Sequence, residues 1–319
     1  MVTKKTTTKK APVKKAPAGK TKVKCTTETT HIGLVRDDAY LAPYEDAIRG
    51  RHEHALWKMN ELTQHGKLTL SDFANGHDYY GLHLTPDGWV FREWAPNATA
   101  IYLVGDFNDW KEEEAYLCHR IEGTGDWELT LPRKAMQHGQ FYKMRVHWQG
   151  GEGERIPAWA QRVVQDETSK IFSAQVWAPE KPYVWKKKTF RPQTSPLLIY
   201  ECHIGMAQDA EQVGSYNEFR EKVLPRIIKD GYNAIQIMAI QEHPYYGSFG
   251  YHVSSFFAAS SRFGTPEELK ALIDEAHRNG IAVIMDIVHS HAVKNEVEGL
   301  GNLAGGVCRG DVAHRRVLL

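Results

Sequence analysis

The stretch Ile281–His291 reads IAVIMDIVHSH, an apolar run that ends in an aspartate and two histidines. Its apolar residues do not alternate with polar ones, which predicts a strand that is covered on both faces, as in a parallel sheet. In a barrel of alternating strands and helices the carboxyl ends of the strands line the active-site mouth, so Asp286 is a candidate site residue. An aspartate that caps the next loop or pairs with a neighbouring arginine is an equally good interpretation of Asp286 taken alone.

Two more strand–helix units are predicted before this stretch. Residues 197–200 and 233–240 have the composition of buried strands. The sequences SYNE at 215–218 and TPEE at 265–268 are capping boxes, and each predicts the start of a helix. The order strand, helix, strand, helix, strand predicts right-handed crossovers in a parallel sheet, and hence a doubly wound fold or a (β/α)8 barrel.

From Tyr79 to about Trp177 the sequence changes to short strands separated by turn residues, which predicts a β-sandwich. The loop GDFNDW, residues 105–110, is polar and ends in an aromatic ring. Because an exposed indole face can pack against the apolar C–H face of a sugar, we expect Trp110 to contact a sugar. Trp127 and Trp148 lie inside predicted strands and are expected to be core residues.

The remaining segments are predicted to be helical or irregular. Between Asp37 and Gly66 apolar residues recur at helical spacing, which predicts one or two packing helices. Residues 1–24 are mostly Lys, Thr, Ala and Pro, so a solvated disordered tail is favoured over a nucleic-acid-binding one. Residues 178–196 are rich in Pro and Lys, which predicts a linker.

Charge and cysteine content indicate the compartment. The formal net charge of the 319 residues is +1, but nine lysines and no acid lie in residues 1–24, which leaves the rest of the chain acidic. The cysteines have no CxxC spacing, which favours a reducing cytosol over a disulfide scaffold or a zinc site; they are Cys25, Cys118, Cys202 and Cys308. We expect neither a secretory signal nor a membrane span, because no apolar run is long enough.

A long loop dense in aromatic residues, Gln241–Tyr251, follows the second predicted barrel strand. Long loops at this face of a barrel usually carry function. A tyrosine ring there can form a platform for a pyranose, while Asp286 and His291 can hydrogen-bond its hydroxyls. The alternative is a cluster of loop side chains that satisfy one another.

The chain resembles 1,4-α-glucan (glycogen) branching enzymes of the α-amylase superfamily over roughly residues 38–304. The resemblance is carried by REWAP, GDFNDW, LIYECHIG, YNAIQIMAIQEHPYYGSFGYHVSSFFAASSRFGTPEEL and DIVHSH. It implies a multidomain β and α/β chain with a carbohydrate-binding β-sandwich before the first part of a (β/α)8 TIM barrel. The implied order is a disordered tail at 1–30, a helical segment at 31–76, the sandwich at 77–178, a linker at 179–196, the partial barrel at 197–305 and a tail that does not resemble the family at 306–319.

The resemblance also implies substrate contacts. The substrate would be an α-glucan, with no metal or organic cofactor, no nucleic acid and no membrane partner. The Asp and the final His of the first barrel motif would hold the sugar beside the cleaved bond, the Tyr of the GYH motif would stack on that sugar, and the Trp-Ala-Pro segment would contact glucan on the sandwich. The implied substrate-binding residues are Asp286, His291, Tyr251, Trp94, Ala95 and Pro96, beside Trp110.

The implied reaction is a retaining transglycosylation in which an Asp nucleophile forms a glucosyl-enzyme and a Glu acid/base activates an incoming 6-hydroxyl. In the family these residues follow the third barrel strand, so no catalytic residue is expected in this chain. We expect a frameshift or premature stop near Gly305. The chain alone is expected to be inactive and to aggregate unless shortened to the sandwich.

Two alternatives come from other classes of protein. One is a glucan-binding protein without catalysis, which fits the residues present. The other is a metal-dependent barrel hydrolase, because Asp286, His289 and His291 form D-x-x-H-x-H. The metal alternative is disfavoured, since an H-x-H pair ends the first strand in such barrels and further ligands would have to come from later strands.

Overall fold

The computed structural model describes residues 33–192, 196–299 and 301, and the chain divides into two units, 1–70 and 71–319. The predicted tail at 1–30, the segment 306–319 and the expected frameshift near Gly305 lie outside the described residues. Among the described helices, none combines the length and the apolar character needed to cross a bilayer.

The described part of the first unit is helical. It contains α1 (Gly33–Asp37), the 3-10 helix η1 (Ala39–Tyr44) and α2 (Glu45–Leu62). The side chain of Asp38 accepts a hydrogen bond from the backbone N of Tyr40 (3.0 Å), which starts η1. The apolar side chains of α2 are exposed within this unit, so the predicted packing face is not buried there; they include Leu56, Trp57 and Met59.

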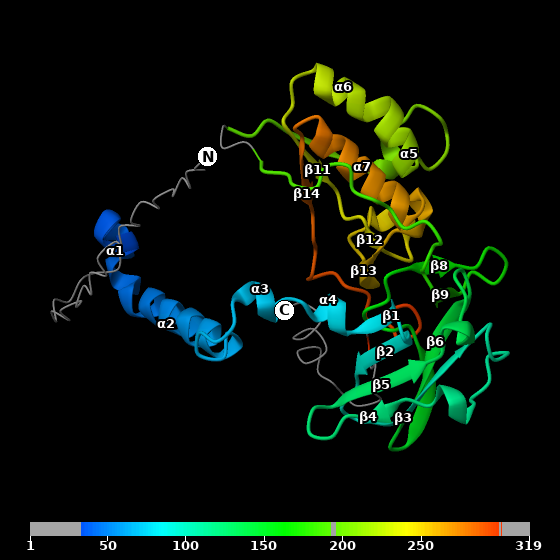
Figure 1. The fold of residues 1–319 in the computed structure, drawn as a ribbon. Coiled ribbons are helices and arrows are strands. Elements are labelled where there is room, and N and C mark those ends of the chain that lie inside the picture. The colour runs from blue at the N-terminus through cyan, green and yellow to red at the C-terminus, as the bar shows by residue number, and fades with distance from the viewer. Residues whose placement is uncertain (1–32, 193–195, 300, 302–319) are drawn as a thin grey trace, which may run out of the picture. The chain divides into compact units, whose positions relative to one another are not determined.

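The boundary between the two units falls within the short helix α3 (Leu70–Phe73). The second unit continues through α4 (Gly76–Tyr79) into a β-sandwich (Figure 1). One antiparallel sheet has the order β1-β2-β5-β4, and the other has the order β3-β6-β9-β8 with β7 paired to β6. The strands are β1 (Gly81–Thr85), β2 (Gly88–Trp94), β3 (Ala98–Gly105), β4 (His119–Arg120), β5 (Asp126–Leu131), β6 (Phe141–Trp148), β7 (Gly151–Arg155), β8 (Val163–Gln165) and β9 (Phe172–Gln175). Two 3-10 turns, η2 (Glu114–Tyr116) and η3 (Arg133–Ala135), connect them.

The core of the sandwich comes from the alternate, inward-facing residues of both sheets. Phe91, Leu103 and Met144 are almost completely buried. Trp127 is buried as predicted, and its ring N–H donates to the backbone O of Ala95 (2.9 Å). Trp148 is only half-buried; its ring packs against the core and also lies 5.2 Å from the guanidinium of Arg155.

The predicted strand–helix units form a three-stranded parallel sheet. Its strands are β10 (Ile199–Cys202), β11 (Ala234–Ile237) and β14 (Ala282–Met285), with Ala234 opposite Ile199 on one side and Ala282 on the other. The connecting elements are η4 (Ile204–Met206), α5 (Tyr216–Glu218), the π-helical turn η5 (Phe219–Val223), α6 (Leu224–Lys229), β12 (Gln241–Glu242), η6 (Tyr246–Ser248), β13 (Ser255–Ala259), η7 (Ser261–Phe263) and α7 (Pro266–Arg278).

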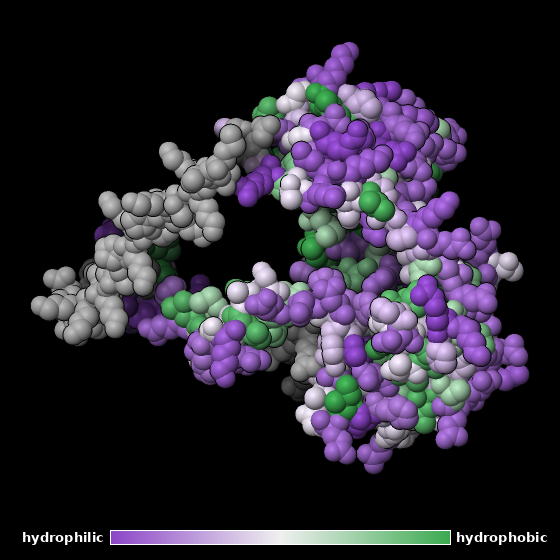
Figure 2. Space-filling view, viewed as in Figure 1, coloured by the Kyte–Doolittle hydropathy of each residue, from purple (hydrophilic) through white to green (hydrophobic). Residues whose placement is uncertain are grey.

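Both predicted capping boxes are present and start α5 and α7. The apolar residues of these helices pack on the sheet with Ile235 and Ile237, while the visible outer surface of α6 and α7 is mainly hydrophilic (Figure 2). The prediction that the stretch at 281–291 is covered on both faces was wrong for its second half. Met285 is 51% exposed and Ile287 is 44% exposed, because β14 is an edge strand of this sheet.

The predicted linker is irregular but attached to α7. The carboxylate of Asp274 accepts hydrogen bonds from the Tyr183 hydroxyl (2.6 Å) and from the backbone N of Lys186 (2.8 Å). The ring of Phe190 stacks on His277 with centroids 4.1 Å apart. These contacts fix the path of the chain between the sandwich and the parallel sheet.

Direct contacts also join the sandwich to the loops of the parallel sheet. The indole of Trp159 stacks between Tyr80, at 5.2 Å, and Phe257, at 4.1 Å. The guanidinium of Arg162 donates to the backbone O of Gly264 (2.6 Å). The two β-layers and the parallel sheet therefore form one continuous body within the second unit.

Candidate functional site

The carboxyl end of β14 places Asp286 beside the aromatic loop. The hydroxyl of Tyr251 donates to Oδ2 of Asp286 (3.3 Å), and both side chains are half-buried. The backbone N of Asp286 donates to the O of Ile237 (3.2 Å), which continues the strand pairing up to the site residue. Burial, and then the charge of Asp286, raises the pKa of Tyr251 above its ordinary value. The structure thus brings together two of the three residues predicted for this site.

The two histidines of this stretch lie on the surface. His291 is exposed in the turn after β14, and no hydrogen bond or ring contact joins it to the Tyr251–Asp286 pair among the described residues. His289 is also exposed, and its ring lies 5.6 Å from that of Phe256. Asp286, His289 and His291 therefore do not form a metal-ligand cluster in the described part of the chain.

A buried carboxylate supports the aromatic loop, and sequence reasoning missed it. Glu242 is fully buried at the end of β12 and accepts hydrogen bonds from the backbone N of His243 (3.0 Å) and of Ser261 (2.6 Å). Burial raises the pKa of Glu242. The loop then turns through Phe249 in the left-handed region (φ 55°), and a side chain on Gly250 would collide with the backbone O of Ala239.

On the sandwich, Trp110 lies at a cavity of about 320 Å³. Its backbone is left-handed (φ 59°), and its ring N–H donates to Oδ1 of Asp106 (3.0 Å). Asn108 holds the loop in this shape by accepting from the backbone N of Gly105 (2.9 Å) and donating to the O of Leu103 (3.0 Å). The lining residues are Asp106, Trp110, Phe141, Lys143, Glu154, Val164, Asp166, Ser169, Ile171 and Ser173.

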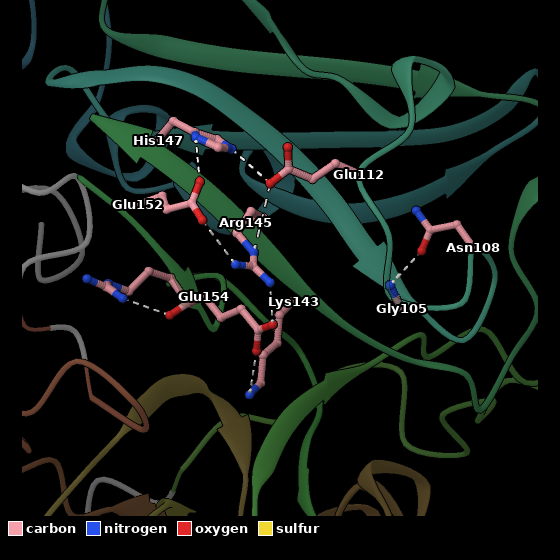
Figure 3. A network of polar contacts seen from close by, with 9 residues as sticks. Gly105, Asn108, Glu112, Lys143, Arg145, His147, Glu152 and Glu154 are labelled. Carbon is pink, nitrogen blue, oxygen red and sulfur yellow. Dashed lines mark hydrogen bonds and ion pairs between the residues drawn. The ribbon is translucent and has the colours of Figure 1, made fainter. Parts of the chain in front are cut away.

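Next to this cavity, charged side chains follow one face of β6 and β7 (Figure 3). The imidazole of His147 contacts the carboxylates of Glu112 (2.9 Å) and Glu152 (3.1 Å), a set of groups that could in principle hold a metal ion. However, the guanidinium of Arg145 lies 4.0 Å from Glu112, 3.6 Å from Glu152 and 3.1 Å from Glu154. A fixed cation thus already offsets part of the negative charge of these carboxylates.

The segment Trp94–Ala95–Pro96 begins at the last residue of β2 and is held by its backbone. The N of Ala95 donates to the O of Gly125 (3.0 Å), and the O of Pro96 accepts from Arg120 (2.8 Å). Ala95 is 1% exposed, so only Trp94 and Pro96 of the predicted trio present surface that a ligand could contact. Ala95 is covered because the Trp127 ring packs beneath it and donates to its carbonyl.

Two family models match the chain. Residues 79–160 match carbohydrate-binding module 48 (isoamylase N-terminal domain), and residues 208–298 match the alpha amylase catalytic domain. The chain therefore contains a carbohydrate-binding sandwich followed by the first part of an amylase-type (β/α)8 barrel, which confirms the predicted fold class.

Curated relatives extend this similarity. The chain is 42% identical over 280 residues to the 1,4-alpha-glucan-branching enzyme of Dictyostelium discoideum, covering 85% of this chain and 40% of that protein. It is 43% identical to the enzyme of Saccharomyces cerevisiae, covering 86% of this chain and 42% of that one. The predicted resemblance to branching enzymes is confirmed, and the chain spans about two fifths of the length of these relatives.

Solved structures agree on the fold alone. The catalytic module of the glycogen-degrading pneumococcal virulence factor SpuA has a TM-score of 0.56 at 19% identity, covering 68% of this chain and 38% of that one. Pullulanase from Bacillus acidopullulyticus has a TM-score of 0.55 at 19% identity, covering 67% of this chain and 30% of that one.

Proposed function

We propose that this chain supplies the glucan-binding sandwich and the first part of the barrel of a 1,4-α-glucan branching enzyme. The reaction would cleave an α-1,4 bond and transfer the released segment to a 6-hydroxyl, with retention at the anomeric carbon. The observation that carries the proposal is the similarity to branching enzymes across both domains.

In this proposal the barrel residues bind the sugar rather than perform the chemistry. The Tyr251 ring stacks on the sugar beside the cleaved bond, and the carboxylate of Asp286 accepts hydrogen bonds from its hydroxyls. His291 would join them by a movement of the exposed turn in which it lies. The nucleophile and the acid/base belong to later barrel strands, so the 319-residue chain by itself binds glucan without turning it over.

The cavity at Trp110 suits an α-glucan. The indole can pack on the apolar face of a glucose ring, and carboxylates, hydroxyls and an ammonium line the same space to bond sugar hydroxyls. Trp94 and Pro96 would form a second contact on the sandwich. We assign the protein to the cytosol, an assignment that the buried free thiols of Cys118 and Cys202 support. Neither nucleic acid nor membrane is proposed as a partner.

A glucan-binding protein without catalysis is the second candidate. The observation in its favour is the match of residues 79–160 to carbohydrate-binding module 48.

The test is to measure maltoheptaose binding and amylose branching with the 319-residue chain. The expected result is binding without new α-1,6 bonds. Addition of a polypeptide carrying the later barrel strands of a branching enzyme should then restore branching, whereas continued inactivity would favour the non-catalytic candidate. Branching by the 319-residue chain alone would refute the assignment of the chemistry to later strands, and the absence of any glucan binding would refute both candidates.

A further inference from the structure

Glu93 is a buried acid directly next to the proposed glucan contact. Its side chain is 1% exposed, although it lies one residue before Trp94 at the end of β2. One carboxylate oxygen accepts from the backbone N of Trp94 (3.0 Å), and the other accepts from the backbone N of Ala158 (2.8 Å). The carboxylate therefore ties the glucan-contacting segment to a second stretch of chain, distant in sequence.

Three other hydrogen bonds to the backbone of this segment do not change with pH near neutrality. They run from Ala95 to Gly125, from Trp127 to Ala95 and from Arg120 to Pro96, and their groups are amides, an indole and a guanidinium. Glu93 is different, because burial raises its pKa from 4.5 to about 7 against the opposing effect of its two backbone hydrogen bonds.

The charged group nearest in effect, Asp126, also raises the pKa of Glu93, and the other neighbours of Glu93 stay neutral. The carboxylate of Asp126 on β5, which also accepts from the Tyr80 hydroxyl (2.8 Å), raises the pKa of Glu93 further. Burial and the charge of Glu93 raise the pKa of the Cys118 thiol and of the Tyr142 phenol, so both stay neutral.

We propose that Glu93 is a positioning residue that holds the Trp94–Pro96 segment for glucan only while it is a carboxylate. Protonation turns one accepting oxygen into a hydroxyl donor, and one backbone N–H then loses its acceptor. Glucan affinity at this segment falls as a result. The inference rests on the proposed role of the segment in glucan binding, and it adds a pH response to that role.

The experiment measures maltoheptaose affinity of the full chain between pH 6 and pH 8. The wild-type affinity should fall about tenfold toward pH 6, the cost of one hydrogen bond to a charged group. Glu93→Gln should bind at the weak level throughout, because an amide has only one accepting oxygen. The matched control is Glu128→Gln, which removes a half-buried carboxylate of β5 that pairs with Arg92, and it should keep the wild-type profile.

A second variant protects the test if Glu93→Gln does not fold. Asp126→Asn removes a charge that raises the pKa of Glu93, so the midpoint of the binding profile should move to lower pH. An unchanged profile in Asp126→Asn, or a wild-type profile in Glu93→Gln, would overturn the inference. If Trp110→Ala abolishes maltoheptaose binding while Trp94→Ala does not, the proposed function is supported and the proposed role of Glu93 is refuted. If the wild type binds no glucan at any pH, the proposed function falls with it.

Discussion

The hydroxyl of Tyr251 lies 3.3 Å from Oδ2 of Asp286 and donates a hydrogen bond to it, so a loop tyrosine is joined to the carboxyl end of β14. The buried carboxylate of Glu242 holds the loop by accepting a backbone hydrogen bond from Ser261. The end of the strand is held by the hydrogen bond from the backbone N of Asp286 to the O of Ile237. Both partners are thus placed by buried structure before any ligand arrives.

Replacement of Asp286 should lower the pKa of Tyr251. Burial is the largest cause of the raised pKa of Tyr251, followed by the charge and the hydrogen bond of Asp286. In Asp286→Asn the phenol should titrate at a lower pH than in the wild type while staying above its ordinary value. NMR of ¹³C-labelled tyrosine, with Tyr251→Phe to assign the signal, measures this. An unchanged titration would show that the pair is separated in solution.

Loss of the Trp110 ring should weaken glucan binding at the sandwich. Truncation of a central aromatic anchor costs about 2 kcal/mol, or roughly thirtyfold in affinity. Trp110→Ala should bind maltoheptaose that much more weakly, as measured by calorimetry. Trp185→Ala removes a 40% exposed tryptophan of the linker and serves as the matched control, with wild-type affinity expected. Equal losses in both variants would contradict a specific contact at Trp110.

Removal of the Glu242 side chain should destabilise the fold strongly. Glu242→Ala leaves the backbone N–H groups of the buried His243 and the half-buried Ser261 without their acceptor. This should lower the free energy of unfolding by about 2 kcal/mol. Glu275→Gln on α7 breaks a surface ion pair with Arg278, next to a surface hydrogen bond from Asn279. It should change the free energy of unfolding by less than about 1 kcal/mol. Thermal unfolding compares the two variants, and similar melting temperatures would refute the supporting role of Glu242.

Glu93 should also make stability depend on pH. Its folded-state pKa of about 7 exceeds the unfolded value near 4.5, so the folded chain holds a proton that the unfolded chain releases. The contribution of Glu93 to the free energy of unfolding is therefore full below pH 4.5 and falls by about 3 kcal/mol as the pH rises to about 7. Urea unfolding of the wild type and Glu93→Gln across this range should show the difference between their stabilities changing by that amount. A constant difference would contradict the raised pKa.

Among the described residues no strand pairs with the outer side of β14, and this edge of the parallel sheet should promote self-association. Met285 on the edge strand β14 is 51% exposed, and such edges pair with other chains unless a charge intervenes. Met285→Lys should reduce the fraction of oligomers seen in sedimentation. Val184→Lys places the same charge at a 77% exposed linker position and should leave that fraction unchanged.

Local patterns predicted the β-sandwich and the parallel sheet, while the choice of a (β/α)8 barrel over a doubly wound fold rested on the family resemblance. Apolar strands without alternation indicated the parallel sheet, and the capping boxes at Ser215 and Thr265 indicated two helix starts that the structure contains. These signals are properties of neighbouring residues, so they can be read without knowing the tertiary structure.

The supporting acids could not be predicted in the same way. Glu93 and Glu242 matter because the backbone of Ala158 and of Ser261 reaches them from elsewhere in the chain. The exposure of Met285 likewise depends on how many strands flank β14, which its own sequence does not encode. Long-range contacts of this kind leave no local pattern.

The strand order β10-β11-β14 has a consequence for synthesis on the ribosome. Each strand of this sheet pairs with one that has already emerged, so the sheet can grow by addition at one edge as the chain is made. The sandwich cannot, because β3 must wait for β6 and β4 must wait for β5. Translation would therefore complete the sandwich first and then extend the barrel strand by strand from its finished neighbour.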